Sequence, residues 1–137
     1  MKKRGFGSGK WNGFGGKIQN KEAIVDAAKR ELFEESGIKA IKLEKVGELT
    51  FFFPHVENNA WDFFVNVFIV KNWEGNPIES DEMLPKWFNF KEIPFEMMWQ
   101  DDRHWLPKIL NDEMVRATFT FHKDNETITY MKMEDMK

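Results

Sequence analysis

The 137-residue sequence contains no cysteine, which excludes disulfide bonds, zinc thiolates and a catalytic thiol. It also lacks an excess of positive charge, since 20 Lys and Arg stand against 23 Asp and Glu, for a net charge of −3. A domain that binds a polyanion normally carries a basic excess. The charge balance therefore argues against binding to nucleic-acid polymers or to membranes.

Long apolar runs are missing as well. No stretch approaches the ~20 apolar residues that a membrane-spanning helix needs. The basic start Met1–Arg4 resembles the first part of a signal peptide, but a glycine-rich stretch follows in place of an apolar run. We therefore expect a cytoplasmic protein.

No internal repeat, linker or low-complexity tract divides the chain, so we expect one domain over residues 1–137 with a single core. The glycine-rich loop is not a phosphate-binding P-loop, because Gly16-Lys17-Ile18 lacks the Ser or Thr that would hold Mg2+. The three histidines of the chain have no metal-site spacing.

Secondary structure is expected from apolar periodicity and from β-branched and aromatic runs. The last two strands form a hairpin. Helices on the faces of a mixed sheet make the fold α/β, or α+β. The expected strands cover residues 43–53, 63–70, 86–90, 115–122 and 127–133, and the expected helices cover about 22–36 and 103–110.

Three acidic residues mark the first helix. At 3.6 residues per turn, Glu31, Glu34 and Glu35 fall within an arc of roughly 100°. Such a cluster can be a solvated helix face, since helix surfaces are commonly acidic. However, the same arc continues through Ile24 and Ala27, which places the carboxylates at the edge of the packing face. Partial burial makes their mutual repulsion costly unless cations neutralise it, so we expect a metal site.

The expected cation is Mg2+, with Mn2+ as a substitute. Mg2+ usually takes one or two protein carboxylates together with waters and substrate phosphates, which suits a pyrophosphate substrate. Around the acids, Gly37 stands where a helix C-cap is expected, and Gly16 supplies tight backbone before the helix. We expect Arg30 to pair with a carboxylate and to fix the loop that precedes the helix.

The whole segment from Gly16 to Ile38 resembles a complete Nudix box, G-x5-E-x7-R-E-U-x-E-E-x-G-U with U aliphatic. The resemblance implies a Nudix fold and hydrolysis of diphosphate bonds. It implies catalytic roles for Arg30, Glu31, Glu34 and Glu35, and a metal group that contains Gly16, Glu31, Glu34 and Glu35.

Further motifs are similar to the branch of the Nudix hydrolases formed by the MutT homologues that act on oxidised purine nucleoside triphosphates. They are Lys2–Gly7, Trp11–Lys17, Glu79–Met83 and Ile93–Phe95, followed by Met98-Trp99 and Asp101-Asp102. This resemblance implies that Asn12, Asp101 and Asp102 hydrogen-bond the base, that Phe6, Phe51 and Trp99 enclose it, that Lys2 approaches the phosphates and that Glu82 joins the metal group. The resemblance also implies a monomer, although the residues themselves leave the oligomeric state open.

The neighbouring aspartates also have a physical reading of their own. Two adjacent carboxyls in a Trp-lined pocket should not both stay charged. With one protonated, the pair offers a donor and an acceptor, and moving the proton lets it read a guanine-like or an adenine-like edge. An alternative stays open, because Asp101 and Asp102 precede a helix and could cap it. Glu82 could be a solvated residue of an acidic turn, and any single aromatic could belong to the core.

The leading hypothesis is a Mg2+-dependent pyrophosphohydrolase that cleaves oxidised purine nucleoside triphosphates to the monophosphate and pyrophosphate. One alternative is a Nudix hydrolase of another nucleoside diphosphate derivative. The other is a nucleotide-binding module without catalysis, although binding alone does not require every carboxylate of the box. Family members carry a strand pair before the segment that starts here at Met1. We therefore expect a strand near Met1–Arg4 with a position beside it that is unfilled or is filled by another chain.

Overall fold

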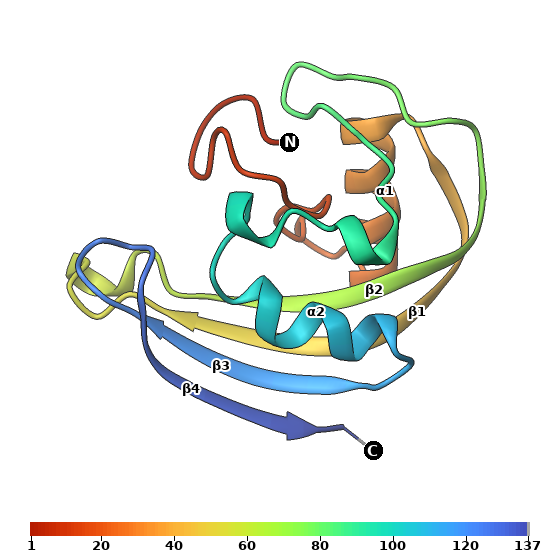
Figure 1. Ribbon diagram of the computed structural model, residues 1–137. Helices are drawn as coiled ribbons and strands as arrows, with labels where there is room; N and C mark the ends of the chain where they lie inside the picture. Colours follow the sequence, from red (N-terminus) through yellow and green to blue (C-terminus); the bar gives the residue numbers. More distant parts are fainter. Residues whose placement is uncertain (137) are drawn as a thin grey trace. The chain divides into compact units, whose positions relative to one another are not determined.

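The computed structural model describes residues 1–136, and Figure 1 labels its elements in chain order. Four strands form one sheet in the order β2-β1-β3-β4. The pair β1 and β3 is parallel and the pair β3 and β4 is antiparallel, so the sheet is mixed and the expected α+β class is confirmed. The elements are α1 (Ile24–Ser36), β1 (Lys39–Phe52), β2 (Phe63–Glu74), α2 (Asp102–Leu110), β3 (Val115–Phe121) and β4 (Ile128–Asp135), with short 3-10 turns at Glu57–Asn59, Phe90–Glu92 and Phe95–Met97.

The contacts within the chain group into two compact units, each built from two segments. The first unit combines Met1–Glu44 with Phe68–Met98, and it contains α1 and the acidic residues of the expected metal group. The second unit combines Lys45–Val67 with the chain from Trp99 onward, and it contains α2, β3, β4 and the two aspartates.

Helix α1 ends where the sequence predicts. Gly37 adopts a left-handed conformation with φ 76°, and its N–H donates to the carbonyl of Phe33 at 2.8 Å, which closes the C-terminus. At the other end Ala23 provides no side-chain cap. Ile24 is 36% exposed, so the expectation that the packing face reaches it is wrong, and this face begins at Ala27. Within residues 1–136, neither of the two α-helices, α1 and α2, is long and apolar enough to cross a membrane.

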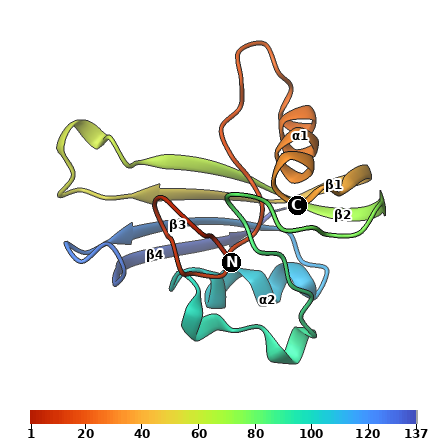
Figure 2. The ribbon, with the colours of Figure 1, turned by 90° about the horizontal axis from the view of Figure 1, so that it is seen from above.

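The second unit packs around β3. The side chains of β3 alternate between buried and less buried positions. Helix α2 packs against this strand, and its ribbon can be followed in Figures 1 and 2. Phe119, Leu49, Ile109 and Val115 are the largest fully buried side chains. Gly47 lies opposite Val115, where a Cβ would approach the Val115 carbonyl oxygen to 3.2 Å. A residue without a side chain therefore permits this close strand pairing.

The expected strand over residues 86–90 is wrong. This segment has no regular secondary structure apart from Phe90, which begins the 3-10 turn Phe90–Glu92. Its side chains make aromatic contacts: the ring of Trp11 meets that of Phe88 edge-on at 5.0 Å, and the Lys86 ammonium lies 5.2 Å from the same ring. Trp87 contacts Trp73 of β2 at 5.8 Å, so the aromatic residues that suggested a strand contact other rings without joining the sheet.

The expected strand near Met1–Arg4 does not form either. Lys2 makes an isolated bridge with Met83, and no longer ladder follows within the described chain. The pairing does not continue beyond Arg4, because Gly5, Gly7 and Gly9 adopt positive φ values of 78°, 84° and 85°. Such values turn the chain out of the extended conformation that a ladder requires.

Candidate functional site

The first unit contains a pocket of about 270 Å³ where α1 meets the segment 80–82; we call it the acid pocket. Five of its lining residues are acidic, so it concentrates negative charge. The structure thereby brings together four residues that the sequence placed in the metal group. Their binding of a metal stays a prediction. The lining consists of Arg4, Glu31, Glu34, Glu35, Ser80, Asp81 and Glu82.

Glu35 is the buried carboxylate of the acid pocket, with 8% of the residue exposed. Burial raises the pKa of this carboxyl to about 7, and the negative charges of Glu31 and Glu82 raise it further. A hydrogen bond from the backbone of Gly15 and the positive charge of Lys2 act in the opposite direction. The expectation that partial burial makes the repulsion among these acids costly is confirmed at this residue.

The backbone of Gly16 lies directly against Glu31. A Cβ added at this glycine would lie 2.4 Å from the carboxylate carbon of Glu31, far closer than two such atoms approach. A side chain at this position would therefore displace the Glu31 carboxylate unless the loop moved. Participation of Gly16 in the metal group stays a prediction.

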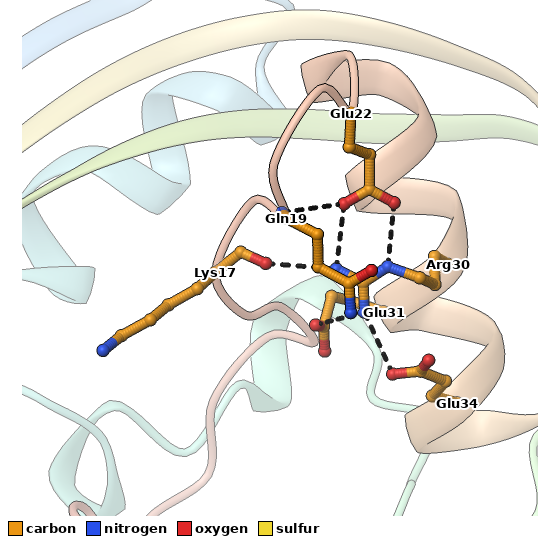
Figure 3. A network of polar contacts seen from close by, with 6 residues as sticks. All are labelled: Lys17, Gln19, Glu22, Arg30, Glu31 and Glu34. Atoms are coloured by element: carbon orange, nitrogen blue, oxygen red, sulfur yellow. Dashed lines mark hydrogen bonds and ion pairs between the residues drawn. The ribbon is translucent and has the colours of Figure 1, made fainter.

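Arg30 ties the loop before α1 to the helix (Figure 3). Its Nε donates to Glu22 at 2.8 Å, and its Nη2 donates to Glu22 at 3.0 Å and to the carbonyl of Lys17 at 3.1 Å. The same Glu22 carboxylate accepts a bond from the Gln19 N–H at 3.0 Å, and its pKa is lowered by the guanidinium. The expected pairing of Arg30 with a carboxylate and its fixing of the loop are both found. Its role in catalysis stays a prediction.

The same guanidinium also engages two of the expected metal ligands. Nη1 of Arg30 donates to Glu31 at 2.7 Å and to Glu34 at 3.1 Å, as Figure 3 shows. Within residues 1–136, no three acidic or histidine side chains converge closely enough to hold a metal ion in this arrangement. The donors still suit a hard divalent cation, because they are carboxylate oxygens whose repulsion around Glu35 a cation would offset. To bind the ion, Glu31 and Glu34 would give up their hydrogen bonds from Nη1 of Arg30.

The second unit holds the two aspartates, and both are buried, each with 4% exposed. Burial raises the pKa of Asp101 to about 6 and that of Asp102 to about 8, and the latter is raised further by the charge of Asp101. The expectation that the two carboxyls do not both stay charged near neutral pH is confirmed. The Oδ2 atom of Asp102 is buried and has no hydrogen-bond partner within the described chain. A buried polar atom of this kind needs an explanation, and a ligand supplies one.

The alternative role of the aspartates as helix caps is not supported. Asp101 stands at the N-cap of α2, but its side chain makes no capping bond and its backbone is helical, with φ −66° and ψ −32°. Its Oδ2 atom accepts a hydrogen bond from the indole Nε1 of Trp105 at 2.8 Å. The carboxylate is thus held away from the helix end by a side chain one turn later.

Aromatic rings pack together elsewhere in the second unit. Phe121 meets Trp99 edge-on at 6.2 Å and stacks with Phe51 at 6.2 Å. Phe51 is only 6% exposed and also stacks with Phe63 at 4.7 Å and Phe119 at 5.7 Å, so it belongs to the core of the second unit. Phe63, which the sequence analysis missed, is 46% exposed. The roles of Trp99 and Phe51 as walls around a base stay predictions.

The other residues expected near the substrate lie in the first unit. Phe6 is 48% exposed, and the exposed Asn12 accepts a hydrogen bond from the N–H of Gly13 at 2.9 Å. The charge of Lys2 acts on Glu35, which places this ammonium near the acid pocket. Contacts of these three residues with a substrate stay predictions.

Sequence reasoning missed several residues of the two sites. Arg4, Ser80 and Asp81 line the acid pocket. All three stand inside the motifs Lys2–Gly7 and Glu79–Met83, so the motifs were a signal, but no role was assigned to these residues. Trp105 could have been found from its position four residues after Asp101, which is one helical turn.

Comparisons with known proteins add to this geometry. A family model described as the NUDIX domain matches residues 1–109. A relative from Danio rerio named oxidized purine nucleoside triphosphate hydrolase is 46% identical over 137 residues, covering 100% of this chain and 85% of that protein. A relative of the same name from Mus musculus is 43% identical, covering 98% and 84%. Among solved structures, a MutT protein from Bacillus halodurans superposes with a TM-score of 0.82 at 24% identity, covering 92% of this chain and 83% of that one, which is a likeness of fold.

Proposed function

We propose a function from the premise that this chain belongs to the Nudix family, a family of hydrolases that generally use divalent metal ions. The proposed reaction is the hydrolysis of oxidised purine nucleoside triphosphates, such as 8-oxo-dGTP, to the monophosphate and pyrophosphate. This reaction would remove damaged precursors from the nucleotide pool. The identity of 46% and 43% with two relatives named for such substrates supports the choice.

The structural observation that carries the proposal is the buried pair Asp101 and Asp102. With pKa values raised to about 6 and about 8, the pair retains one proton near neutral pH. It can then donate one hydrogen bond and accept another along a purine edge, and the Oδ2 atom of Asp102 is available for this contact. Moving the proton between the carboxyls exchanges donor and acceptor, so oxidised guanine and oxidised adenine are both accepted.

A divalent cation in the acid pocket would be held by Glu31, Glu34, Glu35 and Glu82, with the backbone of Gly16 beside them. We propose Mg2+, with Mn2+ as a substitute, because hard carboxylate oxygens suit both. When bound, the cation offsets the charge of the phosphates and lowers the pKa of a water molecule.

The remaining steps belong to the side chains of the chain itself. Glu34 or Glu35 accepts the proton of the attacking water. Lys2 attracts the phosphates, and Arg30 keeps the loop before α1 in place through Glu22. In the second unit, Phe51 and Trp99 would enclose the base.

A substrate panel tests the proposal. The protein is assayed in Mg2+ with 8-oxo-dGTP, an oxidised adenine triphosphate, the undamaged triphosphates and other nucleoside diphosphate derivatives, with pyrophosphate and monophosphate measured separately. We expect the oxidised purine triphosphates to have the highest kcat/KM and to give both products in equal amounts. Faster hydrolysis of another derivative would contradict the proposed substrate, and binding without hydrolysis of any compound would contradict catalysis.

We also propose that the protein acts in the cytoplasm as a monomer. Free nucleoside triphosphates are available there. Cell fractionation and light scattering of the purified protein test the two parts of this statement separately.

A further inference from the structure

We propose that Arg4 is an additional substrate-binding residue, whose guanidinium binds the polyphosphate chain in the acid pocket and favours triphosphates over monophosphates. This inference rests on the proposed function and names a residue that reads the phosphate part of the substrate.

The first reason is the charge of the acid pocket. Within the described chain its lining contains five acidic residues and one basic residue, Arg4. A triphosphate carries several negative charges and is repelled by such a lining unless cations offset it. A divalent cation offsets part of this negative charge, and a positive side chain that lines the pocket attracts the phosphate oxygens that the cation does not neutralise.

The second reason is the position of the Arg4 backbone, which is fixed on both sides. The N–H of Lys3 donates to the carbonyl of Glu82 at 2.8 Å, and the carbonyl of Gly5 accepts from Ser8 at 3.1 Å. Gly5 has φ 78°, a turn conformation that closes the loop directly after Arg4. The Arg4 side chain therefore starts from a defined place opposite Glu82.

The third reason is that the Arg4 side chain is weakly engaged. Its Nη2 lies 3.7 Å from Glu82, and the two side chains are 65% and 56% exposed. Exposed ion pairs of this length contribute little. Arg30 differs, because its side chain is only 21% exposed and donates to three glutamates and to a carbonyl. Arg4 can thus change its partner, whereas Arg30 stays bound to the loop through Glu22 and the Lys17 carbonyl even when Glu31 and Glu34 turn to an ion.

Together these observations describe an exchange of partners. Glu82 turns to a cation in the acid pocket and Arg4 turns to the phosphates. The planar guanidinium binds two phosphate oxygens at once, which the ammonium of a lysine cannot do in the same geometry.

The test compares Arg4→Gln with Arg116→Gln as a matched control. Arg116 is also an exposed arginine in one long ion pair, 3.6 Å from Glu48 with 55% of its side chain exposed, but it lies on β3 in the second unit. Calorimetry measures the binding of two probes, Mg2+ alone and inorganic tripolyphosphate in the presence of Mg2+. Arg4→Lys, which keeps the positive charge but lacks the planar guanidinium that binds two oxygens, is measured in parallel.

Arg4→Gln should bind tripolyphosphate about tenfold more weakly, the loss of one charge-assisted contact. The same variant should bind Mg2+ alone more tightly, because a positive charge and a competitor for Glu82 are removed. Arg4→Lys should lie between wild type and Arg4→Gln, and Arg116→Gln should match wild type. On 8-oxo-dGTP, Arg4→Gln should raise KM more than it lowers kcat.

The opposite signs separate binding from a structural role, since a disturbed pocket would weaken both probes. The proposal is overturned if Arg4→Gln weakens Mg2+ and tripolyphosphate together, if neither changes, or if wild type does not bind tripolyphosphate. Should wild type fail to hydrolyse 8-oxo-dGTP while Arg4→Gln still loses tripolyphosphate affinity, the proposed substrate is wrong and the role of Arg4 stands.

Discussion

At the scale of single residues, burial separates side chains of identical chemistry. Glu34 and Glu35 are adjacent, yet the Glu34 side chain is 55% exposed and bound by Arg30, whereas Glu35 is buried with a pKa raised to about 7. The same contrast holds between the buried Asp102 and the exposed Asp124, whose pKa is lowered to about 2 by hydrogen bonds from Thr127. Chemical roles in this protein therefore depend on environment as much as on residue type.

Replacing the buried acid tests the metal assignment. Glu35→Gln should lower turnover by at least about tenfold, because it removes one hard ligand, while the fold persists because the amide has the same shape. Turnover at saturating Mg2+ and the melting temperature are measured together. Retention of more than about a tenth of wild-type turnover would rule out Glu35 as an essential ligand.

The aspartate pair should control which purine is preferred. Asp101→Asn and Asp102→Asn each impose a fixed donor and acceptor pattern, because an amide cannot exchange protonation states as a carboxyl does. We expect the ratio of kcat/KM for 8-oxo-dGTP to that for an oxidised adenine triphosphate to change in at least one variant by about tenfold or more. An unchanged ratio in both would mean that the pair does not read the base.

At the scale of elements, the loop before α1 and the helix are held together as one structural unit. Arg30 connects them through Glu22 and the carbonyl of Lys17, and the backbone of Gly16 lies against Glu31. The left-handed Gly37 ends the helix one residue after the buried Ser36. The acidic arc is thus placed by contacts at both ends of one short helix.

Gly16→Ala tests this arrangement. The added Cβ would lie 2.4 Å from the Glu31 carboxylate carbon, so either the loop or the carboxylate must move. We expect turnover to fall by about tenfold or more, together with a weaker affinity for Mg2+. Gly13→Ala is the control, because its Cβ would meet nothing within 4 Å and should leave both properties unchanged. Equal behaviour of the two variants would contradict the proposed fit between Gly16 and Glu31.

At the scale of the whole molecule, each of the two compact units is built from two separate segments of the sequence. Each unit also contains buried carboxyl groups, and burying their charged form lowers the stability of the fold at neutral pH. Glu35 lies in the first unit and the aspartate pair in the second. A buried group with a raised pKa stabilises the fold only while it is protonated. The sites therefore have a cost in stability that depends on pH.

The pH dependence follows from the sign of these shifts. Asp102 has a pKa of about 8 in the folded protein against an ordinary value of 3.8, so the folded state keeps a proton that the unfolded state releases. The free energy of unfolding should fall as pH rises from about 4 to about 8. Urea unfolding of wild type and Asp102→Asn at pH 5, 7 and 9 measures this effect. The stability of the variant relative to wild type should increase from pH 5 to pH 9.

The control for this measurement is Asp124→Asn. Its folded pKa of about 2 and its ordinary value of 3.8 both lie below pH 5, so its stability relative to wild type should be constant over the range. A constant difference for Asp102→Asn as well would show that Asp102 is not protonated in the folded protein at neutral pH.

The sequence by itself determined what local periodicity and spacing can carry. The acidic arc of α1, its Gly37 cap and the hairpin of β3 and β4 depend on residues close together in the chain, and the structure contains all of them. Only the tertiary structure decided that residues 86–90 stay out of the sheet and that Arg4 joins the acid pocket. It also decided that Asp101 bonds to Trp105 in place of capping α2. These outcomes depend on burial and on partners distant in sequence, which a local pattern does not contain.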